Sequence, residues 1–285
     1  MFLRKLKGFG PVKINSEYLP RLTDIDNVDR LADYVARREG KLSDAEIEKA
    51  LQESQSIYDR VAKDIRVKVI TVFDDEYPAR FDKLGTKKPS ILYVKGDMDV
   101  LYSKSISVIG TREPSERTLQ AGAAMVKIIV EKYGYTVVSG LALGCDGLAH
   151  RTAIDCGGKT VAVLPGGVNK IAPPAHEQLA ADISGGAGCL LSEYDPDEIA
   201  SKYNFVRRDT LVAALSAGTL ALECRVKSGT MHTVDDAYSL QKPIACYMPD
   251  GAGESFAGNR YILSERGGAP IVKHSDLWEF MEKLE

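Results

Sequence analysis

Residues 106–140 read ISVIG TREPSERTLQ AGAAMVKIIV EKYGYTVVSG, and this stretch decides the fold. It opens with the apolar run Ile106–Gly110 and closes with a second run, Thr136–Gly140. Between them, residues from about 115 to 132 repeat with a period near 3.6, as in an amphipathic helix. Continuous apolar strands joined by a helix are typical of a parallel βαβ unit that is buried on both faces.

The same alternation continues along the chain. Further apolar runs, each short enough for a strand, follow at Thr160–Leu164, Cys189–Ser192, Thr219–Glu223 and Pro243–Tyr247. Helical periodicity recurs between them at roughly 147–156, 175–183, 206–216 and 230–240. Because such crossovers are right-handed, the sequence predicts an α/β fold with a Rossmann-like, doubly wound, mostly parallel sheet.

The first 66 residues have a different character, being rich in charge and poor in glycine after Gly10. Ser43 followed by Glu46 forms a capping box ahead of an amphipathic helix at roughly 43–64. A second helix is expected over Asn27–Arg38. We therefore predict a small helical N-terminal domain, 1–66, followed by a Rossmann-like domain, 67–285.

Composition limits the kinds of partner and compartment. The chain has 37 basic and 40 acidic residues, a net charge of −3, so nucleic acid could bind only through a local basic patch. The longest uncharged stretches are too short to cross a membrane, and the basic N-terminus is not followed by an apolar signal segment. Five cysteines form no CxxC pair, which indicates a reducing, cytoplasmic location.

Ligands of a doubly wound sheet bind beyond the carboxyl ends of its strands, so the residues there are informative. The first strand is followed by Gly110-Thr111-Arg112. This is not the GxGxxG fingerprint, which argues against NAD or FAD. Arg112 offers a bidentate fork for phosphate oxygens, and a surface arginine paired with a nearby glutamate is an equal alternative.

The next two strand ends are rich in glycine. Ser139 and Gly140 open a loop that lets a ligand approach the backbone. Asp146 and His150 follow on one helical face, either as acid–base groups or as a cap and an anchor that shape the loop, and we favour the anchor. The third strand is followed by Gly166-Gly167, a sharp turn leading to Lys170, and Glu193 follows the fourth strand.

The strongest local charge lies further on. Residues 202–227 contain five basic and two acidic side chains, among them Arg207 and Arg208 at a helix start. Ser228-Gly229-Thr230 follows the fifth strand and offers N–H and O–H donors at another helix start. Phosphate binding is favoured here, while a solvated charged face and a simple helix cap are the alternatives.

Together these residues resemble the DNA-processing protein A (DprA/Smf) family. The signatures that carry the resemblance run in order from about 70 to 275 and are Val108–Arg112, Ser139–Ala142, Gly144–Asp146, Ala149-His150, Gly158–Gly167, Leu191–Tyr194, Phe205 with Arg208, Leu215-Ser216, Glu223, Ser228–Thr230, Gly258-Asn259 and Gly268-Ala269. No single one of these motifs would be specific by itself.

The resemblance implies a protein that binds single-stranded DNA and acts in recombination and natural transformation. It further implies a homodimer that helps to load a RecA-type recombinase, with no enzymatic activity, no cofactor, no metal and no membrane contact. We predict that DNA phosphates contact Gly110, Arg112, Ser139, Gly140, Gly166, Gly167, Lys170, Arg207, Arg208, Lys227, Ser228, Gly229 and Thr230. Asp146, His150, Glu193 and Glu223 are predicted to be structural.

Two departures from the family pattern stand out. The family commonly has Arg-Asn-Arg where this chain has Arg208-Asp209-Thr210, which puts part of the usual phosphate contact in doubt. We also expect no C-terminal winged helix in this sequence.

The main alternative is a protein that binds a nucleotide-derived small molecule, or a phosphoribohydrolase of the same superfamily. The catalytic Gly-Thr-x-x-Glu signature of the latter is broken here, because Thr233 stands where its glutamate would be. A third hypothesis is an interaction module whose ligand site is vestigial.

Overall fold

The computed structural model describes residues 1–25 and 27–284, so Glu285, the last residue of the predicted second domain, lies outside the described residues. The chain divides into two compact units. The first comprises Met1–Tyr77 with Phe81–Leu92, and the second comprises Pro78–Arg80 with Tyr93–Glu285. The predicted boundary after residue 66 therefore falls inside the first unit, because the first strand groups with the helices before it.

The first unit is mainly helical. Its elements are α1 (Phe2–Lys5), α2 (Pro11–Lys13), a π turn (Ile14–Tyr18), a 3-10 turn (Leu19–Asp24), α3 (Val28–Glu39), α4 (Asp44–Lys63) and β1 (Val67–Thr71). Both predicted helices are confirmed: the Asn27 side chain caps α3, and Ser43 with Glu46 forms the predicted capping box of α4. A buried cluster around Tyr18, whose ring lies 5.2 Å from that of Phe9, forms the core of this unit.

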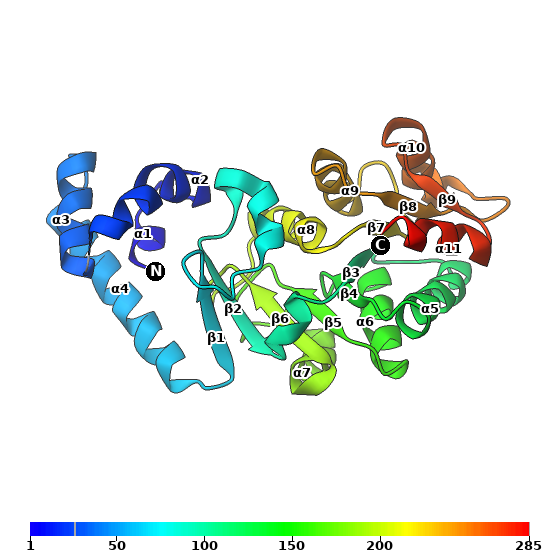
Figure 1. Cartoon of the computed structure of the whole chain (residues 1–285), viewed down its shortest axis with the longest axis horizontal. Coiled ribbons are helices and arrows are strands. Elements are labelled where there is room, and N and C mark those ends of the chain that lie inside the picture. Colours follow the sequence, from blue (N-terminus) through cyan, green and yellow to red (C-terminus); the bar gives the residue numbers. More distant parts are fainter. Residues whose placement is uncertain (26, 285) are drawn as a thin grey trace. The chain divides into compact units, whose positions relative to one another are not determined.

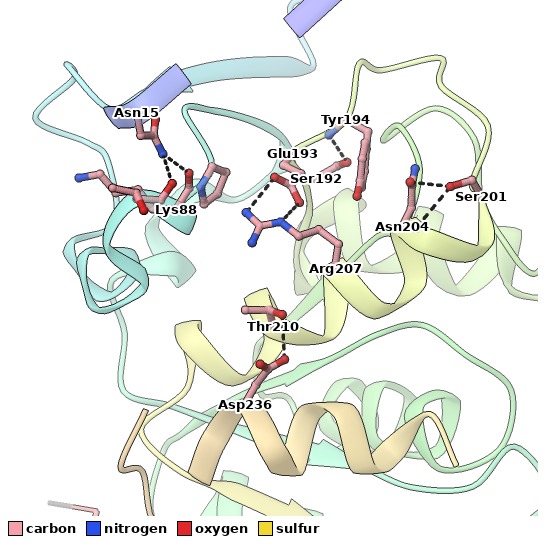
Figure 2. Close-up of polar contacts among 12 residues, drawn as sticks. Asn15, Lys88, Ser192, Glu193, Tyr194, Ser201, Asn204, Arg207, Thr210 and Asp236 are labelled. Atoms are coloured by element: carbon pink, nitrogen blue, oxygen red, sulfur yellow. Dashed lines mark hydrogen bonds and ion pairs between the residues drawn. The ribbon is translucent and has the colours of Figure 1, made fainter. Parts of the chain in front are cut away.

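A single side chain ties the N-terminal helices to the segment before the second strand. The Asn15 amide donates hydrogen bonds to the carbonyl oxygens of Thr86 at 2.9 Å and Lys88 at 2.7 Å (Figure 2). The first of these carbonyls belongs to a 3-10 segment, Ala79–Lys87. These two bonds hold the segment before β2 against the π turn that contains Asn15.

The strands form a sheet in the order β1-β2-β6-β5-β4-β3-β7-β8-β9. Their bounds are β2 (Ile91–Gly96), β3 (Ser105–Ile109), β4 (Thr136–Ser139), β5 (Thr160–Val163), β6 (Gly188–Ser192), β7 (Thr219–Ala221), β8 (Ile244–Tyr247) and β9 (Ala269–Ile271). In the sheet order, every pair of neighbouring strands from β6 across to β9 is parallel, whereas β2 pairs antiparallel with β6. The predicted doubly wound, mostly parallel sheet is confirmed.

Helices cover both faces of the sheet in the second unit. Their bounds are α5 (Glu116–Glu131), α6 (Cys145–Asp155), α7 (Glu177–Asp182), α8 (Lys202–Leu215), α9 (Thr230–Ser239), α10 (Ala257–Glu265) and α11 (His274–Glu282). Helices α5, α6 and α7 lie on one side of the strands, and α8 and α9 lie on the other (Figure 1). On the α5 side the core contains Val126, Ile129 and Phe280, all at most 2% exposed.

The structure adds elements that the sequence pattern did not indicate. Strand β9 has three residues and includes Pro270, and α10 and α11 have nine residues each, so their periodicity is short. All five cysteines are free thiols, four of them buried, and burial raises the pKa of Cys224 and Cys246 to about 12. No helix in the described part of the chain is long and apolar enough to cross a membrane.

Candidate functional site

The order of the strands fixes where a ligand crevice can form. From β3 the chain winds through β4, β5 and β6 in one direction, and from β7 it winds through β8 and β9 in the other. The reversal lies between β3 and β7, which are paired at Val108 and Leu220. In open α/β sheets this switch point is where ligands bind, outside the carboxyl ends of the strands. The loops after β3 and β7 are therefore the walls of the candidate site.

Glu223, just after β7, fastens these two loops together. Its backbone carbonyl accepts a hydrogen bond of 2.7 Å from the Thr111 N–H. Its buried carboxylate accepts from the Ser115 N–H at 3.0 Å, the Ser115 hydroxyl at 2.7 Å and the Thr118 hydroxyl at 2.5 Å. Burial alone would raise the pKa of Glu223, but these hydrogen bonds outweigh it and hold the pKa below its usual range.

Arg112 is exposed in the loop after β3 and lies against an aromatic ring. Its guanidinium carbon is 5.7 Å from the centroid of Phe205, in the second turn of α8. The guanidinium carbon of Arg208 is 5.9 Å from the same centroid. Each contact has cation–π geometry, which fixes the position of a guanidinium without consuming its hydrogen-bond donors. Arg112 and Arg208, far apart in the sequence, therefore contact the same aromatic ring.

Phe205 is a residue of the candidate site that the residues at the strand ends do not indicate. It belongs to the family resemblance but not to the predicted phosphate contacts. The available signal was its position, an aromatic residue three positions before Arg208 and thus on the same face of the helix.

Arg208 is buried and bonded within the protein, and its predicted contact with a phosphate stays a prediction. It is 4% exposed, and its Nη1 donates to the carbonyl oxygens of Gly140 and, at 3.0 Å, Val163. Its Nε lies 2.9 Å from Oδ1 of Asp209. Arg208 therefore joins the ends of β4 and β5 and is neutralised by a neighbouring carboxylate. A Cβ at Gly140 would lie 1.8 Å from Nη1 of Arg208, so this glycine makes room for the arginine rather than for a ligand.

Two carboxylic acids share the environment of Arg208. Burial raises the pKa of Asp209 to about 6, opposed by the charge of Arg208 and reinforced by that of Asp146. Burial also raises the pKa of Asp146, again opposed by Arg208. Thr210, which stands where the family commonly has an arginine, donates a hydrogen bond of 2.8 Å to Asp236 of α9 (Figure 2).

Arg207 is also engaged within the protein. Its Nε and Nη2 lie 2.8 Å and 3.2 Å from the two carboxylate oxygens of Glu193, which follows β6 (Figure 2). Both side chains are largely buried, at 12% and 3% exposure. This bidentate pair anchors α8 to the end of β6, and the predicted phosphate contact of Arg207 stays a prediction.

Asp146 and His150 hold the loop after β4 in shape. Oδ2 of Asp146 accepts hydrogen bonds from the N–H groups of Gly140 at 3.1 Å and Ala142 at 3.3 Å. Nε2 of His150 accepts from the Leu141 N–H, so its Nδ1 carries the proton and donates to the Thr160 hydroxyl at 2.6 Å. Burial, helped by nearby positive charge, lowers the pKa of His150 to about 3, so the ring stays neutral. These contacts are those of an anchor.

Several predicted contacts lie away from the switch point. The Ser139 hydroxyl is fully buried and donates to the Val108 carbonyl at 2.7 Å. Gly166 and Gly167 follow β5, two strands from β3, and pack against the backbone of residues 195–200. Lys170 is exposed at that same strand end. Ser139, Gly166 and Gly167 thus have contacts inside the protein, and their predicted phosphate contacts stay predictions.

Close packing of two backbone segments explains why residue 110 is a glycine. A Cβ at this position would lie 2.5 Å from Sγ of Cys145, where the loop after β3 crosses the start of α6. The glycine lets the two backbones approach each other and so sets the path of the chain toward Arg112. Its contact with a ligand remains a prediction.

The remaining wall of the crevice is the start of α9. Lys227 is exposed, as is Arg225 before it, and the Ser228 hydroxyl donates to the Arg225 carbonyl at 2.7 Å. Gly229 caps the helix with open space where a side chain would be, and Thr230 begins α9. The segment after β7 therefore carries exposed Arg225 and Lys227 ahead of the N-terminus of a ten-residue helix, and the segment after β3 carries exposed Arg112. Each of these groups suits an anion.

The fold and this crevice define a doubly wound α/β protein with an anion-suited switch point. Among the described residues, no three His, Cys, Asp or Glu side chains gather to hold a metal ion. The chain belongs to the DNA recombination-mediator protein A family, whose profile matches residues 68–282. The resemblance inferred from the sequence is thereby confirmed.

Similar proteins extend this result. The chain is 30% identical to protein Smf of Escherichia coli over 197 residues, which cover 69% of this chain and only 52% of that protein. It is 31% identical to the DNA processing protein DprA of Streptococcus pneumoniae over 209 residues, 73% of this chain and 72% of that protein. This chain thus spans about half the length of the E. coli relative.

Two solved structures are similar. The DprA structure from Streptococcus pneumoniae superposes with a TM-score of 0.83 at 24% identity, covering 98% of this chain and 95% of that one. DNA processing protein A from Helicobacter pylori, described for its single-stranded DNA binding mode, has a TM-score of 0.67 at 26% identity, covering 78% of this chain and 96% of that one.

Proposed function

We propose that this protein binds single-stranded DNA through its phosphates at the crevice between the loops after β3 and β7. The observation that carries the proposal is the exposed guanidinium of Arg112, positioned by Phe205 and facing solvent on a loop that Glu223 fixes. Lys227 and the start of α9 supply further donors on the other wall. Family membership supports the same ligand.

The crevice suits a flexible strand better than a duplex. With a net charge of −3, this chain offers positive charge in a confined place, and a single strand can bend its phosphates into it. A rigid duplex presents its phosphates along a broad face, which requires a broad basic surface. In the cell, such a protein would act in the cytoplasm as a mediator of recombination, as a homodimer that hands the strand to a RecA-type recombinase, without enzymatic activity or cofactor.

Fluorescence anisotropy with a labelled oligothymidylate tests the proposal. For each phosphate that the protein neutralises, the binding constant should fall by roughly 0.7 log unit for every tenfold rise in salt concentration. Arg112→Ala should weaken binding for all sequences and reduce this slope by about one contact. Arg37→Ala removes an exposed arginine from α3 in the first unit and serves as the matched control. Equal affinity for duplex and single strand, or normal binding by Arg112→Ala, would contradict the proposed site.

The enzymatic alternative is tested in parallel. A phosphoribohydrolase would release free base from nucleoside monophosphates, and we expect no release by this protein. If the wild type released base and the Arg112→Ala variant did not, the site would be that of a nucleotide-hydrolysing enzyme, and the DNA-binding proposal would be wrong.

A further inference from the structure

A buried leucine in the loop after β4 has an unusual backbone conformation. Leu141 has a φ of 59°, and its side chain is 0% exposed. This left-handed conformation is uncommon for residues other than glycine and costs free energy, so it persists only where surrounding contacts hold it. Strained residues of this kind cluster where a loop must be presented in one fixed shape, so the contacts that hold Leu141 are informative.

Two histidines bond to the two backbone polar groups of Leu141. Nε2 of His150 accepts a hydrogen bond from its N–H at 3.3 Å, and Nδ1 of His176 donates one to its carbonyl oxygen at 2.9 Å. His150 belongs to α6, whereas His176 lies in a 3-10 turn, Pro174–His176, ahead of α7. Both rings are buried. The left-handed residue is therefore clamped by side chains from two separate segments.

The ring of His176 is itself held in place. Its Nε2 accepts a hydrogen bond of 3.4 Å from Nη1 of Arg151, which leaves Nδ1 as the donor toward Leu141. The absence of a side chain at Gly147 makes room for the ring, because a Cβ there would lie 2.6 Å from Cε1 of His176. The ring thus packs closely on α6, and a rotation would break both of its hydrogen bonds.

The same loop supports the backbone of Arg112. Gly144, which ends the loop, has a φ of 74°, and a Cβ there would lie 2.5 Å from the carbonyl oxygens of both Thr111 and Arg112. The N–H of Cys145 donates a hydrogen bond of 3.1 Å to the Thr111 carbonyl. The loop after β4 therefore packs directly against the loop after β3. Because only two residues separate Leu141 from Gly144, the conformation at Leu141 determines where this support lies.

We propose that His176 is a positioning residue of the phosphate site and acts on the DNA only through Arg112. Together with His150 it keeps Leu141 in its left-handed conformation, and the loop so shaped supports the Arg112 backbone. This inference rests on the proposed function. Without His176, the buried Leu141 carbonyl loses this donor and the loop relaxes away from its strained shape. Arg112 then reaches a phosphate in only a fraction of the molecules, which lowers the apparent affinity by that fraction.

A double-mutant cycle tests whether His176 acts through Arg112. His176→Leu removes the hydrogen-bond donor and keeps an apolar side chain at this position. With Arg112 present, it should weaken oligothymidylate binding by about 2- to 10-fold in fluorescence anisotropy, as expected for coupled residues. It should also lower the salt slope toward that of Arg112→Ala. In the Arg112→Ala background, His176→Leu should cause no further loss of affinity.

Further variants separate positioning from general destabilisation. The amide nitrogen of asparagine is as many bonds from Cβ as Nδ1 of histidine, so His176→Asn should bind like the wild type. Tyr77→Phe is the matched control, because it removes a donor from another backbone carbonyl, that of Pro89 at 2.7 Å in the first unit. It should leave affinity and salt slope unchanged. If circular dichroism shows that His176→Leu does not fold, His176→Phe, which keeps a ring but lacks the donor, replaces it in the cycle.

The possible outcomes distinguish this inference from the proposed function. Normal affinity and slope in His176→Leu, an equal loss with and without Arg112, or equally weak binding by His176→Asn would overturn the positioning role. If the wild type binds no single strand, or if Arg112→Ala binds normally, the proposed function fails. If Arg112→Ala binds weakly while His176→Leu binds normally, the function stands and only this inference fails.

Discussion

The carboxylate of Glu223 accepts hydrogen bonds from both the backbone N–H and the hydroxyl of Ser115, a residue 108 positions earlier in the chain. The two residues belong to the loops on either side of the switch point. Their contact makes the two walls of the crevice one connected piece, so the position of Arg112 depends on a residue that follows a different strand.

We expect Glu223→Gln to lower both stability and DNA affinity. One oxygen of Glu223 accepts three hydrogen bonds, and loss of its charge weakens them. The free energy of unfolding should fall by about 1–3 kcal/mol. Urea denaturation measures this, and anisotropy should show weaker oligothymidylate binding. Unchanged affinity in a destabilised variant would show that the loop keeps its shape without Glu223.

Substitutions of Arg208 and of Arg112 should differ in their effect on the stability of the protein. Arg208→Met leaves the carbonyls of Gly140 and Val163 and the carboxylates around it without their buried partner, so unfolding should become easier by roughly 3 kcal/mol. Arg112→Ala should leave the urea midpoint unchanged, because its side chain is exposed. A direct phosphate role for Arg208 would instead give a fully stable variant with a reduced salt slope.

Asp209 should make stability depend on pH. Its folded pKa of about 6 lies above the unfolded value of about 3.9, so the folded state keeps a proton that the unfolded chain releases. Stability contributed by Asp209 is therefore present below about pH 4 and lost as pH rises through 6. Relative to Asp209→Asn, the wild type should lose up to about 3 kcal/mol between pH 4 and 7. A parallel pH profile for the two proteins would contradict this.

His150→Ala should lower the melting temperature. The Leu141 N–H would lose its acceptor in a fully buried place, and the missing ring would leave a cavity, which together cost about 2–4 kcal/mol. His274→Ala, at an exposed position, is the control. If His150→Ala kept its stability but abolished a measurable reaction, His150 would be a catalytic group and not an anchor.

The fold could be predicted from the sequence because the apolar runs that indicate strands are local and recur along the chain. The apolar runs near Ile106, Thr136 and Thr160 became β3, β4 and β5 within one or two residues of the predicted bounds. Short or polar elements such as β9 gave no such signal. The boundary near residue 66 followed a change in composition, whereas the compact unit is set by packing, which joins β1 to the helices.

The candidate site was only partly readable. Strand order places Arg112 at the switch point, and that follows from counting βαβ units. Arg207 and Arg208 look alike in sequence, yet a helix turns them about 100° apart, one onto Glu193 and the other under Gly140. Which strand end each would meet depends on how α8 crosses the sheet, and no local pattern carries that information.

The pairing of β3 with β7 has a consequence for how the nascent chain acquires its structure. Ser107 and Thr219 are 112 residues apart and hydrogen-bonded, whereas β4 begins fewer than 30 residues after β3 ends. During synthesis at about 5–20 residues per second, one edge of β3 stays open for roughly 5–20 s after the other is paired. An open edge is a template for pairing with another chain. The joint between β3 and β7 thus closes well after β3 has paired with β4, and during that interval the open edge exposes newly made chains to aggregation.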